Sequence, residues 1–233
     1  MPIDPGPCRW VLPDPAGARP GQEALAIGAD LAPATMLAGY RGGLFPMPDR
    51  RRLAWFSPDP RGVLPLAGFH ASRSLRRSVR GFSVSIDQSF EAVLASCADP
   101  SRSGGQWITS SYRQAYRRLF ALGWAHSVEI WRDGRLVGGL LGVEVGGLFC
   151  GESMFHSVTD ASKAAMWATV AVLATSQSAS PLFDVQWLTP HLASMGAIAV
   201  SRSRYLARLP PALAADPVFR PMLPRPAATF VTG

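Results

Sequence analysis

Hydrophobic and polar residues follow the periods of helices and strands along most of the chain, beginning near residue 29. Residues 1–22 are instead rich in proline and glycine, which predicts an extended arm. The stretch 29–45 predicts a short helix that starts near Pro33 and ends at two adjacent glycines. Residues 47–66 are broken by prolines and predict loop with a short strand.

Beyond residue 66 the pattern predicts helices mixed with strands. Helical periodicity covers residues 70–81, 87–98, 109–123, 160–176, 190–196 and 202–209. Strand-like runs cover residues 82–86, 126–131, 135–145, 148–155, 182–188 and 197–200. Asp87 is a candidate N-cap for the helix that follows it. Asp133-Gly134 predicts a hairpin turn, and the proline-rich tail from Pro210 is expected to be irregular.

This succession predicts an α+β fold with a mixed sheet, of the acetyltransferase-like (GNAT) type. We expect a small N-terminal domain over residues 1–65, the GNAT-like domain over 66–209, and a tail over 210–233. Acetyltransferases of this type hold the CoA pyrophosphate with a glycine-rich loop at a helix N-terminus. The corresponding connection here, residues 156–162, contains no glycine. An acyl donor other than CoA is therefore expected.

Composition limits the partners and the compartment. The net charge of +7 favours a polyanionic partner, although a GC-rich genome would also enrich arginine; of 23 basic side chains only Lys163 is a lysine. The three cysteines are far apart and form neither a disulfide framework nor a zinc motif. Neither a signal peptide nor a long apolar run is present, so we expect a cytoplasmic protein without a membrane partner. No metal or cofactor is expected.

Several motifs resemble one known family when they are taken together. They are "YRGGLFPM", "WFSPDPRGVL", "WIT", "LFCGESMF", "DASKAA", "FDVQ" and "HLASMGA", in this order. They are similar to those of the bacterial leucyl/phenylalanyl-tRNA–protein transferases, from about Leu12 to Leu209. The resemblance implies transfer of Leu or Phe, and as a further candidate Met, from aminoacyl-tRNA to an N-terminal Arg or Lys. Proteins modified in this way are marked for N-end-rule degradation. The resemblance also implies Leu-tRNA, Phe-tRNA and such acceptor proteins as partners. We expect the protein itself to be a monomer.

Asp184 and Gln186 are two residues apart on a predicted strand, so their side chains are expected to share one face. The resemblance matches them with the catalytic Asp and Gln of the family. The reaction is aminolysis of an ester, in which Asp184 would polarise Gln186 and the amide of Gln186 would act as base or orient the amine. The alternative is a pair that only holds two strands together.

Glu152 lies in an apolar strand, where an ionised carboxylate needs a partner. The partner is either the cationic N-terminus of an acceptor protein, which would give Glu152 a role in catalysis, or an internal Lys163 or Arg. Lys163 itself stands at the start of a helix, where a cation gains nothing from the helix dipole. Its partner is either phosphate or Glu152.

Further substrate-binding residues come from the resemblance. It matches an apolar pocket for the transferred amino acid with Leu140, Phe149, Met154, Met166 and Phe183. Strict alternation would place Phe149 and Met154 on opposite faces of their strand, unless Gly151 marks a β-bulge. Phe56 and Trp107 are matched with aromatic residues that stack on the terminal adenosine, and Tyr116 belongs to the same substrate site. Each of these residues would also suit an ordinary core.

Four arginines, Arg73, Arg76, Arg77 and Arg80, fall on one face of a predicted helix. Such a stripe suits contacts with the phosphates of tRNA, and the alternative is a solvated basic face. Two other functions stay open at this point. One is a different tRNA-dependent acyltransferase, such as a peptidoglycan cross-bridge enzyme, and the other is a tRNA-binding module without catalysis.

Overall fold

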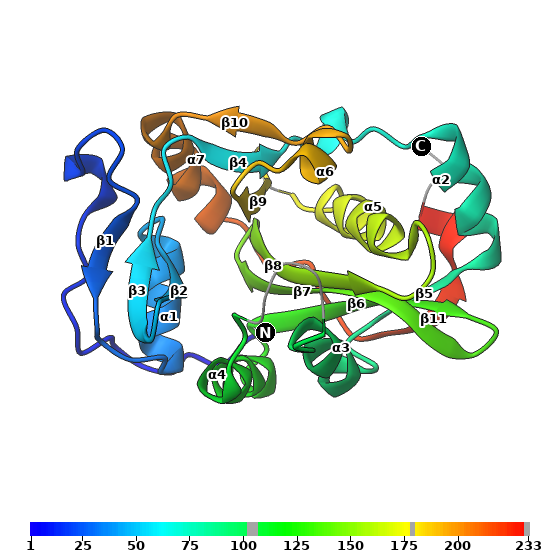
Figure 1. Ribbon diagram of the computed structural model, residues 1–233, viewed down its shortest axis with the longest axis horizontal. Helices are drawn as coiled ribbons and strands as arrows, with labels where there is room; N and C mark the ends of the chain where they lie inside the picture. The colour runs from blue at the N-terminus through cyan, green and yellow to red at the C-terminus, as the bar shows by residue number, and fades with distance from the viewer. Residues whose placement is uncertain (102–106, 178–179, 231–233) are drawn as a thin grey trace.

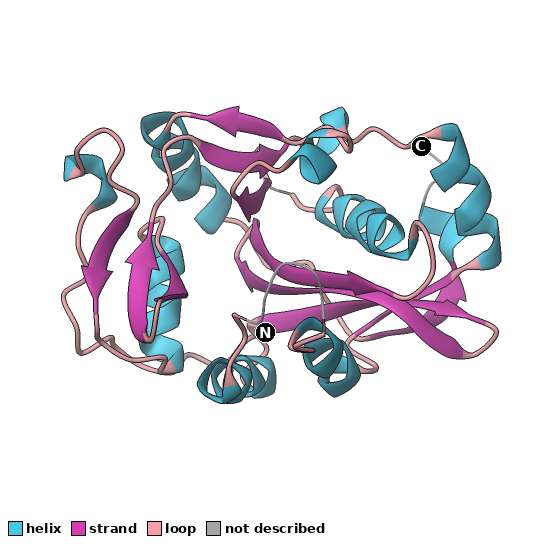
Figure 2. Ribbon diagram, viewed as in Figure 1, coloured by secondary structure: helices cyan, strands magenta, loops and turns pink. Residues whose placement is uncertain are grey.

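The computed structural model describes residues 1–101, 107–177 and 180–230 as a mixed α/β protein with two sheets (Figures 1 and 2). The smaller sheet has three antiparallel strands in the order β1–β3–β2. Its strands are β1 (Ala24–Ile27), β2 (Phe45–Asp49) and β3 (Arg52–Phe56), accompanied by helix α1 (Pro33–Arg41). This part is the small N-terminal domain.

The larger sheet has eight strands in the order β10–β4–β9–β8–β7–β6–β5–β11. Its strands are β4 (Arg61–Leu64), β5 (Ser83–Ile86), β6 (Ala125–Arg132), β7 (Arg135–Val145), β8 (Leu148–His156), β9 (Leu182–Gln186), β10 (Ile198–Val200) and β11 (Met222–Pro226). All neighbouring pairs are antiparallel except β8 and β9, which are parallel. The expected mixed sheet and the three antiparallel strands β6, β7 and β8 are therefore confirmed.

Helices cover both faces of this sheet. They are α2 (Arg73–Ser78), α3 (Phe90–Cys97), α4 (Ser110–Ala121), α5 (Ala161–Leu173), α6 (Pro190–Ala193) and α7 (Arg202–Leu213). Figure 1 shows α3 and α4 on one side of the sheet and α5 on the other. Most of α5 is buried, because it lies between the sheet and a layer that contains α2 and the 3₁₀ turn Ala227–Phe230. Within the described ranges no helix is both long and apolar enough to cross a bilayer.

Of two local signals in the sequence, the predicted hairpin turn is present in the structure and the predicted helix N-cap is not. Asp133 and Gly134 both have positive φ, 51° and 71°, as a tight hairpin turn of this kind requires. Asp87, however, does not cap α3, since Ser89 occupies the N-cap position and Asp87 has φ 58°. Its carboxylate instead accepts the backbone N–H of Ser127 at 2.8 Å and contacts Nδ1 of His126 at 2.8 Å.

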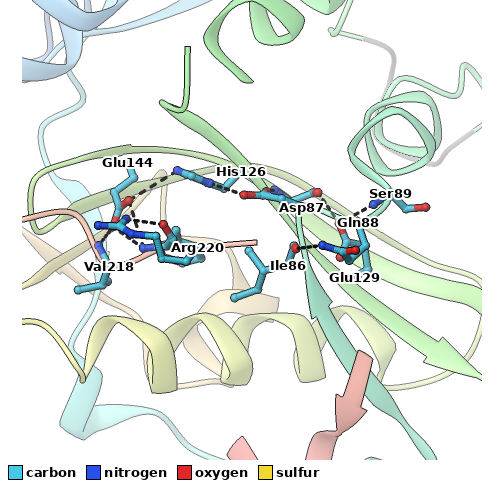
Figure 3. Close-up of polar contacts among 11 residues, drawn as sticks. Ile86, Asp87, Gln88, Ser89, His126, Glu129, Glu144, Val218 and Arg220 are labelled. Carbon is cyan, nitrogen blue, oxygen red and sulfur yellow. Dashed lines mark hydrogen bonds and ion pairs between the residues drawn. The ribbon is translucent and has the colours of Figure 1, made fainter. Parts of the chain in front are cut away.

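The tail from Pro210 is more ordered than expected. Helix α7 continues to Leu213, and β11 pairs with β5 at the edge of the large sheet. The buried Glu144 carboxylate accepts the backbone N–H groups of Val218 at 2.6 Å and Phe219 at 3.2 Å. Figure 3 shows His126 between the carboxylates of Asp87 and Glu144. The tail is thus fixed by a buried acceptor that periodicity could not reveal.

One strand joins the two domains. β4 lies within residues 1–65, which the sequence assigned to the N-terminal domain, but it pairs with β9 and β10 of the large sheet. Residues 61–64 are therefore structurally part of the large sheet, and the small sheet ends at Phe56.

Candidate active site

Two cavities meet beside the end of β9. The apolar cavity, of about 200 Å³, is lined by Leu140, Gly151, Glu152, Ser153, Met154, Met166, Val185, Gln186, Trp187, Thr189 and Leu192. The aromatic cavity, of about 120 Å³, is lined by Phe45, Pro46, Met47, Trp107, Glu152, Gln186 and Trp187. Both cavities therefore share Glu152, Gln186 and Trp187. A wider groove of about 820 Å³ adjoins the apolar cavity at Met154, but neither Glu152 nor Gln186 lines it.

A β-bulge in β8 places Glu152 at this junction. Ser153 pairs with Leu141 and Gly151 pairs with Gly142, so Glu152 is the extra residue between them. A bulge re-aims the side chain that it carries. It also explains how Phe149 and Met154 pack in the same apolar cluster despite their spacing along the strand. The bulge that the sequence suggested near Gly151 is confirmed, one residue further on.

The two oxygens of the Glu152 carboxylate differ in their hydrogen bonding. The hydroxyl of Tyr116, on α4, donates to Oε2 at 2.7 Å. Oε1 is enclosed and has no hydrogen-bond partner among the described residues. Burial raises the pKa of Glu152 to about 7, although the nearby hydroxyls of Tyr116 and Tyr40 both oppose that rise. Near neutral pH this carboxyl group can therefore both accept and release a proton.

Asp184 is part of a fully buried ion pair. Arg61 Nε donates to Oδ1 at 2.9 Å and Arg61 Nη2 donates to Oδ2 at 2.6 Å. The hydroxyl of Tyr205 also donates to Oδ2, at 2.9 Å. The guanidinium of Arg61 lies over the rings of Phe45 and Tyr205. Bidentate geometry of this kind fixes both groups, and both carboxylate oxygens of Asp184 are engaged by donors within the protein.

Gln186 stands at the end of β9 with φ 57°, which breaks the strand alternation. Its backbone N–H donates to Asp184 Oδ1 at 2.9 Å. Its side-chain Nε2 is enclosed and has no partner within the described part of the chain. The contact thus runs from the main chain of Gln186 to the Asp184 carboxylate, and not between the two side chains as the sequence suggested. Asp184 holds the backbone turn that presents Gln186.

The predicted apolar pocket is only partly the observed one. Leu140, Met154 and Met166 line the apolar cavity. Phe149 and Phe183 are fully buried behind it, with their rings edge-to-face at 5.6 Å. They form its support and not its lining. A pocket wall and the layer behind it are equally apolar, so sequence pattern does not separate them.

The predicted aromatic contacts are divided in a similar way. Trp107 lines the aromatic cavity. Phe56 does not line it, since it packs behind the cavity against Phe45 and Trp187. Tyr116 acts through its bond to Glu152 and not on the cavity wall. Among the lining residues that sequence reasoning missed, Trp187 borders both cavities, and it carried no signal beyond its position next to Gln186.

The arginine stripe and Lys163 lie near the start of α5. Arg73, Arg76, Arg77 and Arg80 are all exposed, while Leu75 and Val79 are buried beneath them. Ser78 donates to Asp160 at 3.0 Å, which attaches α2 to the start of α5. Lys163 pairs with Asp160 at 2.9 Å, so the carboxylate that it contacts is that of Asp160 and not that of Glu152. The internal pair between Glu152 and Lys163 is excluded.

Comparison with known proteins gives one consistent result. A family model described as "Leucyl/phenylalanyl-tRNA protein transferase" matches residues 63–210, and a model of its "N-terminal domain" matches residues 29–59. Relatives named "Leucyl/phenylalanyl-tRNA--protein transferase" include that of Edwardsiella ictaluri, 47% identical over 79% of this chain and 76% of the relative. That of Thiobacillus denitrificans is 44% identical over 94% of this chain and 92% of the relative.

Proposed function

The chain belongs to the leucyl/phenylalanyl-tRNA–protein transferase family, and we propose that it transfers Leu or Phe from their tRNAs to the N-terminal Arg or Lys of acceptor proteins. It is an aminoacyltransferase that uses aminoacyl-tRNA and protein substrates. The proposal includes Met as a further transferred residue, N-end-rule degradation of the product, and a cytoplasmic monomer. It also includes a GNAT-type origin of the large domain, supported by the order β6, β7, β8, α5, β9.

The observation that carries the proposal is the pair of cavities with Glu152 and Gln186 at their junction. The apolar cavity suits one aliphatic or aromatic amino-acid side chain, because Leu140, Met154 and Met166 offer only apolar contacts. The aromatic cavity suits the terminal adenosine, which Trp107 contacts by stacking. The ester that joins these two parts of the substrate then lies beside Glu152 and Gln186.

The reaction follows from these positions. The acceptor amine attacks the ester carbonyl carbon, the new C–N bond forms, and the bond to the ribose oxygen breaks as that oxygen takes up the proton lost by the amine and becomes the free hydroxyl of the tRNA. Glu152 Oε1 accepts a hydrogen bond from the acceptor ammonium, and its pKa of about 7 allows it to take that proton. The Gln186 side chain donates to the carbonyl oxygen or orients the amine. Asp184 positions Gln186 through the backbone.

A transfer assay tests the proposal. Leu-tRNA labelled in the amino acid is mixed with the protein and a casein-like acceptor that begins with Arg, and label is expected in the acceptor. The matched acceptor with an acetylated N-terminus should take no label. Transfer to a peptidoglycan precursor instead of the acceptor would favour the cross-bridge enzyme. Binding of Leu-tRNA without transfer to either acceptor would leave a tRNA-binding module.

The arginine stripe is expected to bind tRNA phosphates. Replacing Arg77 and Arg80 with alanine should weaken Leu-tRNA and Phe-tRNA binding alike and flatten the slope of log K against log salt by about two units. The matched control is the double variant Arg117→Ala, Arg118→Ala on α4, which removes the same charge from exposed side chains, one of them paired with Glu91. Equal slopes for the two double variants would mean a general charge effect and would assign the stripe to a solvated face.

A further inference from the structure

Trp187 emerges from a tightly constrained backbone. It follows Gln186, whose positive φ of 57° ends the strand and which pairs with Gly62 on β4, and its own main chain passes close to Gly62. A Cβ atom at Gly62 would lie 2.8 Å from the Trp187 carbonyl carbon, so only glycine leaves room for the chain there. The place where the indole leaves the backbone is therefore fixed by β4 and not by the cavity that the indole lines.

The indole itself is held from three sides. Its Nε1–H donates to Glu23 Oε2 at 3.1 Å. The ring stands edge-to-face on Phe45, with centroids 4.9 Å apart, and Phe56 packs against it at 5.7 Å. Glu23 comes directly before β1, and Phe45 and Phe56 belong to β2 and β3. The N-terminal domain thus holds a side chain of the large domain in place.

Two methionine side chains in the wall of the apolar cavity can change conformation more easily than the indole of Trp187. Met154 and Met166 are unbranched and can change rotamer to suit different ligands. An indole with two fixed torsions and a hydrogen bond at its edge cannot adapt in this way. Trp187 also borders the aromatic cavity, so its ring forms the partition between the two cavities together with Glu152 and Gln186.

We infer that Trp187 sets the upper size of the amino-acid side chain that the enzyme transfers, and that Glu23 is a positioning residue for it. The inference rests on the proposed function, because it takes the apolar cavity as the binding site of the transferred residue. A rigid partition favours the branched and compact side chain of Leu over the longer ring of Phe. Removing the partition joins the two cavities and relaxes that limit.

The test measures kcat/KM for Leu-tRNA and Phe-tRNA with one acceptor peptide, in wild type and in Trp187→Ala. The ratio of Phe to Leu should rise by roughly tenfold, the scale of a small change in a hydrophobic pocket. The ratio is an internal control, because a partly unfolded variant or a weaker adenosine contact lowers both values by the same factor. Equal losses for the two substrates would overturn the inference. A wild type inactive on both substrates would instead overturn the proposed function.

The role of Glu23 is tested by two variants. Glu23→Gln keeps an oxygen that can accept the indole N–H, and it should leave the Phe to Leu ratio at the wild-type value. Glu23→Leu removes the acceptor, and its ratio should shift in the same direction as that of Trp187→Ala, by a smaller factor. An unshifted ratio in Glu23→Leu would show that the aromatic contacts alone hold the ring, and would remove Glu23 from the inference.

Discussion

Asparagine in place of Asp184 is expected to abolish most transfer and to lower the free energy of unfolding by about 3–5 kcal/mol. The reason is the Arg61 guanidinium, which is buried and would lose its only close carboxylate within the described residues. Asparagine keeps one oxygen, which can accept either the backbone N–H of Gln186 or the bonds now made to Oδ2, but not both. Urea unfolding and a single-turnover transfer assay measure the two effects separately.

The hydroxyl of Tyr205 supplies a graded control for this prediction. Tyr205→Phe removes one bond to Asp184 but leaves the ion pair, so the expected loss of stability is only about 1 kcal/mol. The double variant Arg61→Leu, Asp184→Leu should recover part of the stability that Asp184→Asn loses, without recovering activity. An Asp184→Asn variant as stable as wild type but inactive would show that Asp184 takes part in the chemistry directly.

Replacing Glu152 with glutamine is expected to remove one of two ionisations from the pH dependence of transfer near neutrality, and to leave that of the acceptor α-amine. In wild type, kcat/KM should rise with pH through an apparent pKa near 7, as Glu152 Oε1 becomes able to take the proton of the acceptor amine. Glutamine cannot do so, and kcat/KM should fall by about 10²–10⁴-fold. The acceptor α-amine titrates in both enzymes, so the comparison isolates Glu152. An unchanged profile in Glu152→Gln would assign it to structure alone.

The same substitution is expected to change how stability depends on pH. Folding raises the pKa of Glu152 from 4.5 to about 7, so the folded state favours the neutral acid. That stabilisation is complete below pH 4.5 and is lost as pH rises through 7, a change of about 3 kcal/mol. Glu152→Gln lacks this loss and should be the more stable protein at pH 8. Tyr116→Phe removes the bond that favours the charged form, so its transition should move to higher pH.

Parts of the site that are formed by residues close together in the sequence could be predicted, whereas parts formed by distant residues could not. Local features were predictable: the hairpin at Asp133-Gly134 follows from its residues, and the bulge beside Gly151 from the spacing of Phe149 and Met154. Glu152 was a candidate because it is a carboxylate in an apolar strand. Because each of these signals lies within one strand or one turn, the sequence alone was sufficient to read it.

Features that depend on distant residues were not predictable. Arg61 and Asp184 are separated by 123 positions, and no periodicity links them. The role of Trp187 could be recognised only from the fold, in which Glu23 of the N-terminal domain accepts its indole N–H. Strand β11 was not predicted, because it is an exposed edge strand with two prolines and no alternation of apolar residues.

The place of β4 in the large sheet has a consequence for synthesis on the ribosome. β4 lies between β9 and β10, which end at residues 186 and 200, so a strand made early must wait for partners made late. At ordinary translation rates that wait is on the order of ten seconds. Meanwhile both edges of β4 can form hydrogen bonds with incorrect strands. Such pairing is opposed by Pro60, Pro65 and the charge of Arg61. Since Arg61 finds Asp184 only when β9 arrives, the nascent chain is expected to depend on chaperones until the strand closes.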